Sequence, residues 1–146
     1  MRRKLFIGVA STVAVLGLVL ATIAGMSRFM ETFGVLRQFQ DFSLTVVNRS
    51  DHDILSVEIG ILQSGANGGI VEGDSRHLYT RTIKSGQKAK IRPGLTIRGE
   101  GGIYMRYTDS TGAEKLAMAC SYTEHASGYS IATVTNDGVD VEEACM

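Results

Sequence analysis

Soft metal ligands gather near the end of the chain, where sulfur and imidazole side chains could bind Cu(I) or Zn²⁺. They are Met118, Cys120, His125, Cys145 and Met146. No CxxC or HxxxH spacing organises them, and the alternation in residues 113–122 puts Met118 and Cys120 on the core side of a strand. We therefore predict no metal site and no cofactor here. A metal- or ligand-binding protein that uses this Cys/Met/His end remains the alternative.

The densest ionisable cluster is Asp51-His52-Asp53, in which two carboxylates flank an imidazole and could bind a metal. Adjacent residues in a strand point to opposite sides, and this tripeptide follows further polar residues at 48–50. It is therefore predicted to be a turn. No nucleophile elbow, phosphate-binding glycine loop or HExxH motif occurs, so the chain is predicted not to be an enzyme.

Cys120 and Cys145 are the only cysteines in the chain. An even number of cysteines in an oxidising compartment indicates a disulfide, so the two residues are predicted to pair. The bond would fix a C-terminus that ends one residue later. The alternative is a buried free thiol at Cys120 and a frayed C-terminus.

Positive charge is concentrated in residues 75–99, which contain seven Lys or Arg residues and no Asp or Glu. Strand alternation predicts that Lys88, Lys90 and Arg92 project to one solvent-facing side. Together with Arg81 they form a candidate interaction stripe for an acidic protein, anionic lipid or polyanionic polymer. The alternative is a solvated edge strand whose lysines prevent aggregation through strand pairing.

Short alternating strands separated by turn residues would position these side chains. We predict an all-β fold, a small antiparallel β-sandwich of immunoglobulin-like type with about seven or eight strands. Hairpin-like turns are expected at Ser85-Gly86, at Asp109-Ser110-Thr111-Gly112 and at Asn136-Asp137-Gly138. The predicted strands cover residues 42–49, 53–62, 77–83, 87–92, 102–108, 113–122, 129–135 and 139–143.

The same alternation predicts which side chains face the core. Bulky apolar residues recur at every second position in four of these strands. The predicted inward side chains are Phe42, Leu44, Val46, Leu55, Val57, Ile59, Ile61, Ile103, Met105, Tyr107, Leu116, Met118, Cys120 and Tyr122.

An uncharged apolar segment, residues 5–26, precedes the β domain. As a helix it would span about 33 Å, close to the hydrocarbon core of a membrane. The basic residues 2–4 then keep the N-terminus in the cytoplasm, so we predict a cytoplasmic tail at 1–4 and a transmembrane signal anchor at 5–26. The alternative is a cleaved signal peptide and a secreted protein. An apolar signal region of about 7–15 residues would be shorter than this one.

Gly17, Ala21 and Gly25 lie four residues apart on one side of that helix and form a candidate helix-packing face. The alternative is that glycine is simply common in membrane helices. Residues 27–40 continue at helical spacing and are predicted to be an amphipathic juxtamembrane segment. Packing of those side chains against the β domain is equally open.

Residues 41–146 carry 10 Lys or Arg and 14 Asp or Glu, which argues against nucleic-acid binding. We expect them to form an extracytoplasmic β-sandwich, periplasmic or extracellular, on a bacterial inner membrane. The resulting functional hypothesis is a membrane-anchored interaction module, a non-catalytic accessory subunit of a cell-envelope complex. Its protein partner could also be contacted through the transmembrane helix.

Overall fold

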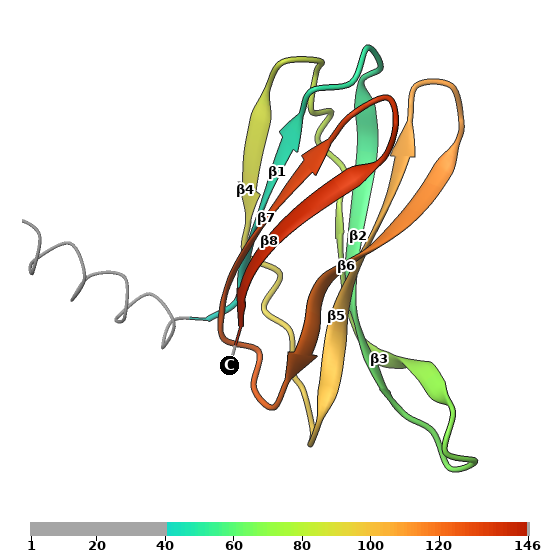
Figure 1. Ribbon diagram of the computed structural model, residues 1–146, viewed down its shortest axis with the longest axis vertical. Coiled ribbons are helices and arrows are strands. Elements are labelled where there is room, and N and C mark those ends of the chain that lie inside the picture. The colour runs from blue at the N-terminus through green and yellow to red at the C-terminus, as the bar shows by residue number, and fades with distance from the viewer. Residues whose placement is uncertain (1–40, 146) are drawn as a thin grey trace, which may run out of the picture. The chain divides into compact units, whose positions relative to one another are not determined.

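Two four-stranded sheets make up residues 41–145, the part of the chain that this computed structural model describes (Figure 1). The strand order is β4-β1-β7-β8 in one, the β1 sheet, and β3-β2-β5-β6 in the other, the β2 sheet. The predicted all-β sandwich is confirmed at this level. The strands are β1 (Ser43–Asn48), β2 (Ile54–Ser64), β3 (Ile70–Tyr79), β4 (Lys88–Ile91), β5 (Gly101–Asp109), β6 (Glu114–Thr123), β7 (Gly128–Val134) and β8 (Val139–Cys145).

The structure does not test the predictions made for residues 1–40, because it describes only residues 41–145. None of the described residues forms a helix that is long and apolar enough to cross a membrane. The predicted tail at 1–4, transmembrane helix at 5–26 and amphipathic segment at 27–40 fall outside the described residues, and so do Gly17, Ala21, Gly25 and Met146.

The core lies between the two central strands of each sheet. Strands β1 and β7 bury their inward side chains against those of β2 and β5, because alternate residues of a strand point to the same side. The inward faces predicted for 42–46, 57–61 and 103–107 are confirmed. The largest core side chains include Phe42, Leu44, Ile54, Ile59, Ile103, Met105 and Tyr107.

The predicted inward face of β6 is wrong at three of its four positions. Leu116, Met118 and Tyr122 are exposed, whereas Cys120 is buried as predicted. The pairing of β6 with β5 shifts register beside Ile103, and an extra residue at a bulge changes which side chains point inward. A similar irregularity at the start of β2 leaves Leu55 exposed.

Two predicted pairings also differ from the structure. Only residues 77–79 of the strand predicted at 77–83 lie in β3, which begins at Ile70, ends at Tyr79 and forms a hairpin with β2 rather than with β4. The turn at Ser85-Gly86 therefore lies in a connection from one sheet to the other. In addition, β1 pairs with β7 in parallel, although every other pairing is antiparallel. Alternation within a strand carries no information on the direction of its neighbour.

Candidate functional site

The solvent-facing side of the β2 sheet, here called the outer face, carries the described features best suited to binding a protein. Its strands expose apolar side chains that would ordinarily be buried, with Ile70 at 77% exposure and Leu116 at 55%. Leu78 and Met118 on the same sheet are exposed as well. Large apolar side chains left in solvent make this face the candidate functional site.

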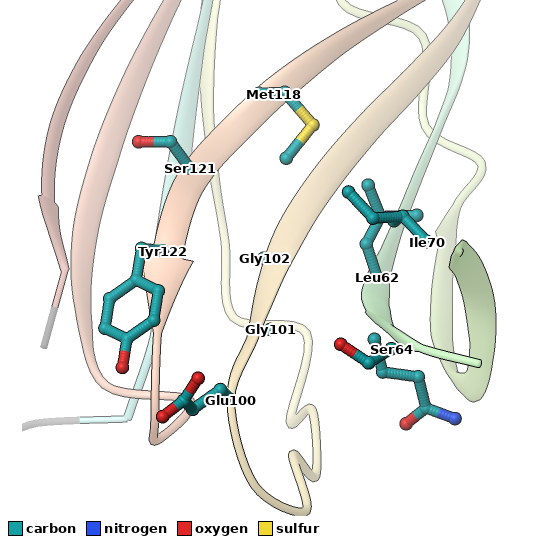
Figure 2. A pocket seen from close by; sticks show the side chains of 10 residues that line it. Leu62, Ser64, Ile70, Glu100, Gly101, Gly102, Met118, Ser121 and Tyr122 are labelled. Carbon is teal, nitrogen blue, oxygen red and sulfur yellow. The ribbon is translucent and has the colours of Figure 1, made fainter. Parts of the chain in front are cut away.

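An open pocket of about 210 Å³ lies on the outer face, near the ends of β2 and β6. Leu62 and Ile70 line one side, Met118 and Tyr122 line the other, and Gly102 lies between them (Figure 2). A Cβ atom at Gly102 would lie 3.0 Å from the Met118 methyl group and 3.0 Å from the Cys120 carbonyl oxygen. Because Gly102 has no side chain, the space between it and Met118 stays open and forms the base of the pocket. Its rim is polar and includes Ser64, Glu100 and Ser121.

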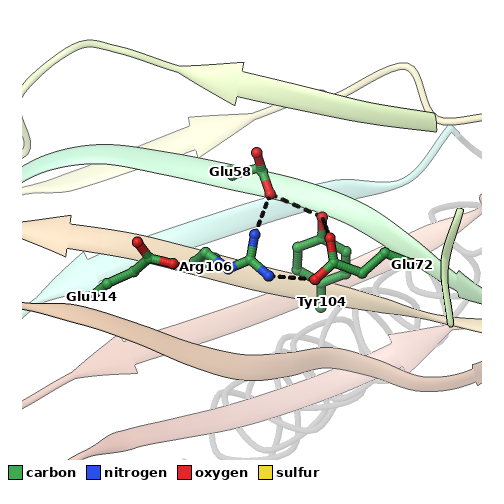
Figure 3. A network of polar contacts seen from close by, with 5 residues as sticks. All are labelled: Glu58, Glu72, Tyr104, Arg106 and Glu114. Carbon is green, nitrogen blue, oxygen red and sulfur yellow. Dashed lines mark hydrogen bonds and ion pairs between the residues drawn. The ribbon is translucent and has the colours of Figure 1, made fainter. Parts of the chain in front are cut away.

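A charged network occupies the centre of the same face and is built around Arg106 (Figure 3). The guanidinium donates from Nη1 to Glu58 Oε1 at 2.9 Å and from Nη2 to Glu72, and its Nε forms an ion pair with Glu114 Oε1 at 3.1 Å. One arginine and three glutamates leave the network with a net charge of −2. Because all three donor nitrogens are engaged, Arg106 is held in one orientation.

Tyr104 fixes the network from below. Its ring lies 5.2 Å from the Arg106 guanidinium, and its hydroxyl donates to Glu58 Oε1 at 2.9 Å. Although it belongs to an outer face, the tyrosine is only 1% exposed. Burial, and then the hydrogen bond to Glu58, raise the pKa of Tyr104 to about 12. The raised pKa therefore keeps the hydroxyl protonated, and able to donate, even above its ordinary pKa of 10.0.

Gly60 makes room for this arrangement. It is the cross-strand partner of Tyr104, whose ring lies across the glycine backbone. A Cβ atom at Gly60 would come within 2.5–2.6 Å of the Tyr104 ring and hydroxyl. Glycine within a strand commonly marks such a close approach. The absence of a side chain at Gly60 thus gives the Tyr104 ring its place at the centre of the outer face.

Sequence reasoning did not find the outer face. Its members lie in four strands, and Glu58 and Arg106 are joined only through the register of β2 with β5. One signal for this face was present in the sequence of β6. If Leu116 and Met118 faced inward, the small residues Ala117 and Ala119 would face outward, and the opposite arrangement was equally compatible with alternation. The structure buries Ala119 and exposes the two larger side chains.

The candidate stripe lies elsewhere, on the edge strand β4 of the β1 sheet and in nearby loops. Lys88, Lys90 and Arg92 are exposed as predicted, and so is Arg81. In the strand pairing, Lys90 lies beside Thr45 of β1. The other edge strand of this sheet, β8, lies beyond β7 and carries Asp140 and Glu142. Three strand spacings, about 14 Å, exceed a Debye length of about 8 Å, so these acids do not neutralise the stripe.

Charge reversal in the stripe should change binding but not folding. The triple variant Lys88→Glu, Lys90→Glu and Arg92→Glu is expected to keep its melting temperature within a few degrees of wild type, because exposed charges are each worth about 0–1 kcal/mol. Any salt-sensitive association with a partner or an anionic membrane should weaken. Measurements are a thermal melt and vesicle co-sedimentation at low and physiological salt.

A control variant separates the stripe from net charge. Arg49→Glu, Lys84→Glu and Arg98→Glu reverse three other exposed charges and give the same change in net charge. If both triple variants bind as well as wild type, β4 serves only as a protected edge.

The predicted Cys120–Cys145 disulfide is present, with Cα atoms 6.2 Å apart. It joins β6 of one sheet to β8 of the other. Beside it, the backbone N–H of Ser121 donates to Glu143 Oε2 at 2.6 Å, which adds a second link between the sheets. This edge of the sandwich is therefore closed covalently and by hydrogen bonds.

Three potential metal ligands, Cys120, Glu143 and Cys145, have donor atoms within 4.8 Å of one another. The two sulfur atoms are bonded to each other, and a metal ligand must be a thiolate. Of the other soft ligands, Met118 lies on the outer face and His125 in the exposed connection after β6, while Met146 falls outside the described residues. The polar tripeptide Asp51-His52-Asp53 is the turn that was predicted.

Comparison with known proteins yields no family. No family model and no curated protein matches the chain. Among solved structures, a protein from Eubacterium rectale is similar at 8% identity and a TM-score of 0.45, covering 74% of this chain and 92% of that one. The human-specific toxin intermedilysin is similar at 11% identity and a TM-score of 0.33, covering 74% of this chain and 24% of the toxin.

Proposed function

We propose that this protein is a membrane-anchored, non-catalytic interaction module whose outer face binds a protein partner. The observation that carries the proposal is the open apolar pocket at Leu62, Ile70 and Met118 beside a rigid charged network. Strong interfaces concentrate their energy where one apolar or aromatic side chain fills such a pocket within a polar rim. The network supplies orientation without needing to reorganise on binding.

The charge of the outer face defines the partner chemistry. Around the pocket and network the acids Glu58, Glu72, Glu100 and Glu114 outnumber the bases, and Arg106 is already engaged by three of them. A matching segment therefore carries an apolar side chain next to Lys or Arg. Such charge complementarity favours the association rate and selects against acidic partners.

The anchor belongs to the same proposal. Residues 5–26 hold the chain in the bacterial inner membrane with the β domain outside the cytoplasm. The full chain should stay with membranes after alkaline carbonate washing, and its intact mass should include residues 1–26. A mature protein that begins near Gly25 would instead identify a cleaved signal peptide and a secreted domain.

A charge introduced into the pocket should abolish docking. Met118→Lys fills the pocket and repels a cationic segment, so affinity for the partner that co-purifies with the wild-type chain should fall at least 30-fold, about 2 kcal/mol. Met118→Glu also removes the apolar contact but retains the attraction, so its loss should be smaller. Because Met118 is 37% exposed, both variants should fold.

A matched exposed residue provides the control. Leu55→Lys introduces the same charge at the other end of β2 and should bind the partner like wild type. Equal affinity for all four proteins would disprove the proposed docking surface. A greater loss for Met118→Glu than for Met118→Lys would show that the partner is acidic.

A further inference from the structure

The free edge of β6 lacks devices that protect the other sheet edges. Edge strands are usually kept from pairing with another chain by charged side chains or by an irregular backbone. Strand β4 carries two lysines, β8 carries three acids, and the pairing of β3 with β2 is irregular beside Gly60. In β6 the pairing with β5 is regular from Glu114 to Met118, and residues 116–120 carry no charge.

The backbone of this segment directs hydrogen-bonding groups away from β5. At the turn before it, the Asp109 N–H donates to the Ala113 carbonyl at 3.0 Å. Counting from Ala113, every second residue of β6 bonds to β5, because hydrogen-bonded pairs alternate along an antiparallel ladder. Leu116 and Met118 fall between these residues, so their N–H and C=O groups face the free edge. In residues 41–145 no turn or loop backbone bonds to them.

The other sheet closes the rest of this edge. The Ala119 carbonyl accepts from the Ser130 hydroxyl, and the Ser121 N–H donates to Glu143. The disulfide between the two sheets lies at the same place. The open part of the edge is therefore residues 114–118, a stretch of about 17 Å in extended conformation.

An open groove of about 600 Å³ lies beside the open part of the edge, between β6 and β8. Its apolar lining comes from both sheets and includes Leu116, Ala117, Met118, Val139 and Val141. The two valines are only half-buried, although they pack against the core. A strand added to β6 would place its inward side chains over these valines and its outward side chains beside Leu116 and Met118.

Charge selects the kind of chain that fits this edge. Residues 114–118 and 139–145 together carry four acids and one base. They are Glu114, Asp140, Glu142 and Glu143, with Lys115 as the base. A second copy of this chain would bring two sets of these acids together, which is unfavourable, whereas a cationic segment is attracted.

We propose that the open edge of β6 takes up an extended, cationic segment of a partner protein as an additional strand. In strand addition, main-chain hydrogen bonds provide affinity and alternate side chains provide specificity. The inference rests on the proposed docking of a cationic segment at the outer face, and it adds the conformation of that segment. Met118 lines both the outer-face pocket and the groove, so one segment reaches both.

A heptapeptide of alternating lysine and valine, acetylated and amidated at its ends, is the probe for this edge. It should bind the ¹⁵N-labelled full chain in detergent micelles with saturation. Hydrogen exchange of the Leu116 and Met118 amides should slow at least about tenfold, because both become hydrogen-bonded. The matching peptide of glutamate and valine should bind at least about tenfold more weakly.

N-methylated peptides test main-chain pairing without altering the protein. An added strand turns only alternate amides toward β6. Methylation of every valine nitrogen or of every lysine nitrogen should therefore give one peptide that binds and one that does not. Strand addition is disproved if the unmethylated peptide does not bind or if the two methylated peptides bind alike.

Leu116→Pro removes the edge-facing N–H but no hydrogen bond to β5, so it should fold. It should bind the unmethylated peptide at least about tenfold more weakly than wild type. Leu116→Ala keeps the N–H and is the matched control, which should lose less affinity. Equal affinity of the two variants would overturn strand addition, and so would self-association of the full chain that protects the same amides.

The co-purifying partner distinguishes this inference from the docking proposal on which it rests. Loss of the partner in Met118→Lys but not in Leu116→Pro would leave the docking surface standing and remove strand addition. Retention of the partner in both variants would remove the docking surface as well.

Discussion

Replacing both Cys120 and Cys145 by alanine should lower the free energy of unfolding by at least about 3.5 kcal/mol, the contribution of the bond alone on the chain-entropy model. The bond joins residues 25 apart and so closes a loop of about 26 residues in the unfolded chain. It also joins the edges of the two sheets, where Cys120 is fully buried. Urea denaturation of the oxidised wild type and of the double variant measures the difference. The two curves are fitted with the same m-value, the slope of the free energy of unfolding against urea concentration.

The reduced wild-type protein is the control for that experiment. It keeps both side chains and lacks only the bond, so its stability should lie between those of the oxidised protein and the double variant. The gap between the reduced protein and the variant reports the packing of the Cys120 side chain. An unchanged urea midpoint in the double variant would contradict a stabilising role for the bond.

Substituting valine for Gly60 should have an effect of similar size and should also abolish partner docking. The new side chain occupies the space of the Tyr104 ring, so the tyrosine must leave its site. Lost burial of an aromatic ring and the lost hydrogen bonds of its hydroxyl to Glu58 and Glu72 together cost about 2–4 kcal/mol. Calorimetry measures the stability, and partner affinity reports the collapse of the outer face.

Gly69 offers a matched control in the loop between β2 and β3. A Cβ atom there meets nothing within 4 Å, and its φ lies outside the left-handed region. Gly69→Val should therefore change stability by less than about 0.5 kcal/mol. If the two valine variants are equally stable, Tyr104 has an alternative position and the Gly60–Tyr104 pair does not fix the surface.

Much of the fold could be read from local pattern. Alternation located seven of the eight strands closely and gave the correct inward faces for β1, for β5 and for most of β2. Turn chemistry located the loop closed by Gly112, which has a φ of 83°, and the turn after β7. These features depend on neighbouring residues alone, so a single sequence contains them.

The candidate site depends on information that alternation does not contain. In β6, alternation allowed either of two sets of side chains to face the core. The bulge in its pairing with β5 accompanies the set that leaves Leu116 and Met118 exposed. The Arg106 network requires the register of four strands, which long-range pairing sets. Hydrophobic residues on the outside of a sheet were therefore assigned to the core, and the proposed docking surface was missed.

The parallel pairing of β1 with β7 has a kinetic consequence. Ser43 is aligned with Tyr129, so the two strands are joined by residues 86 apart in the chain. At a synthesis rate of about 5–20 residues per second, β7 is made about 4–17 s after β1. The other neighbour of β1, strand β4, is made sooner. We therefore expect the β1 sheet to be completed only after nearly all of the chain has been synthesised, and such long-range closure makes folding slow.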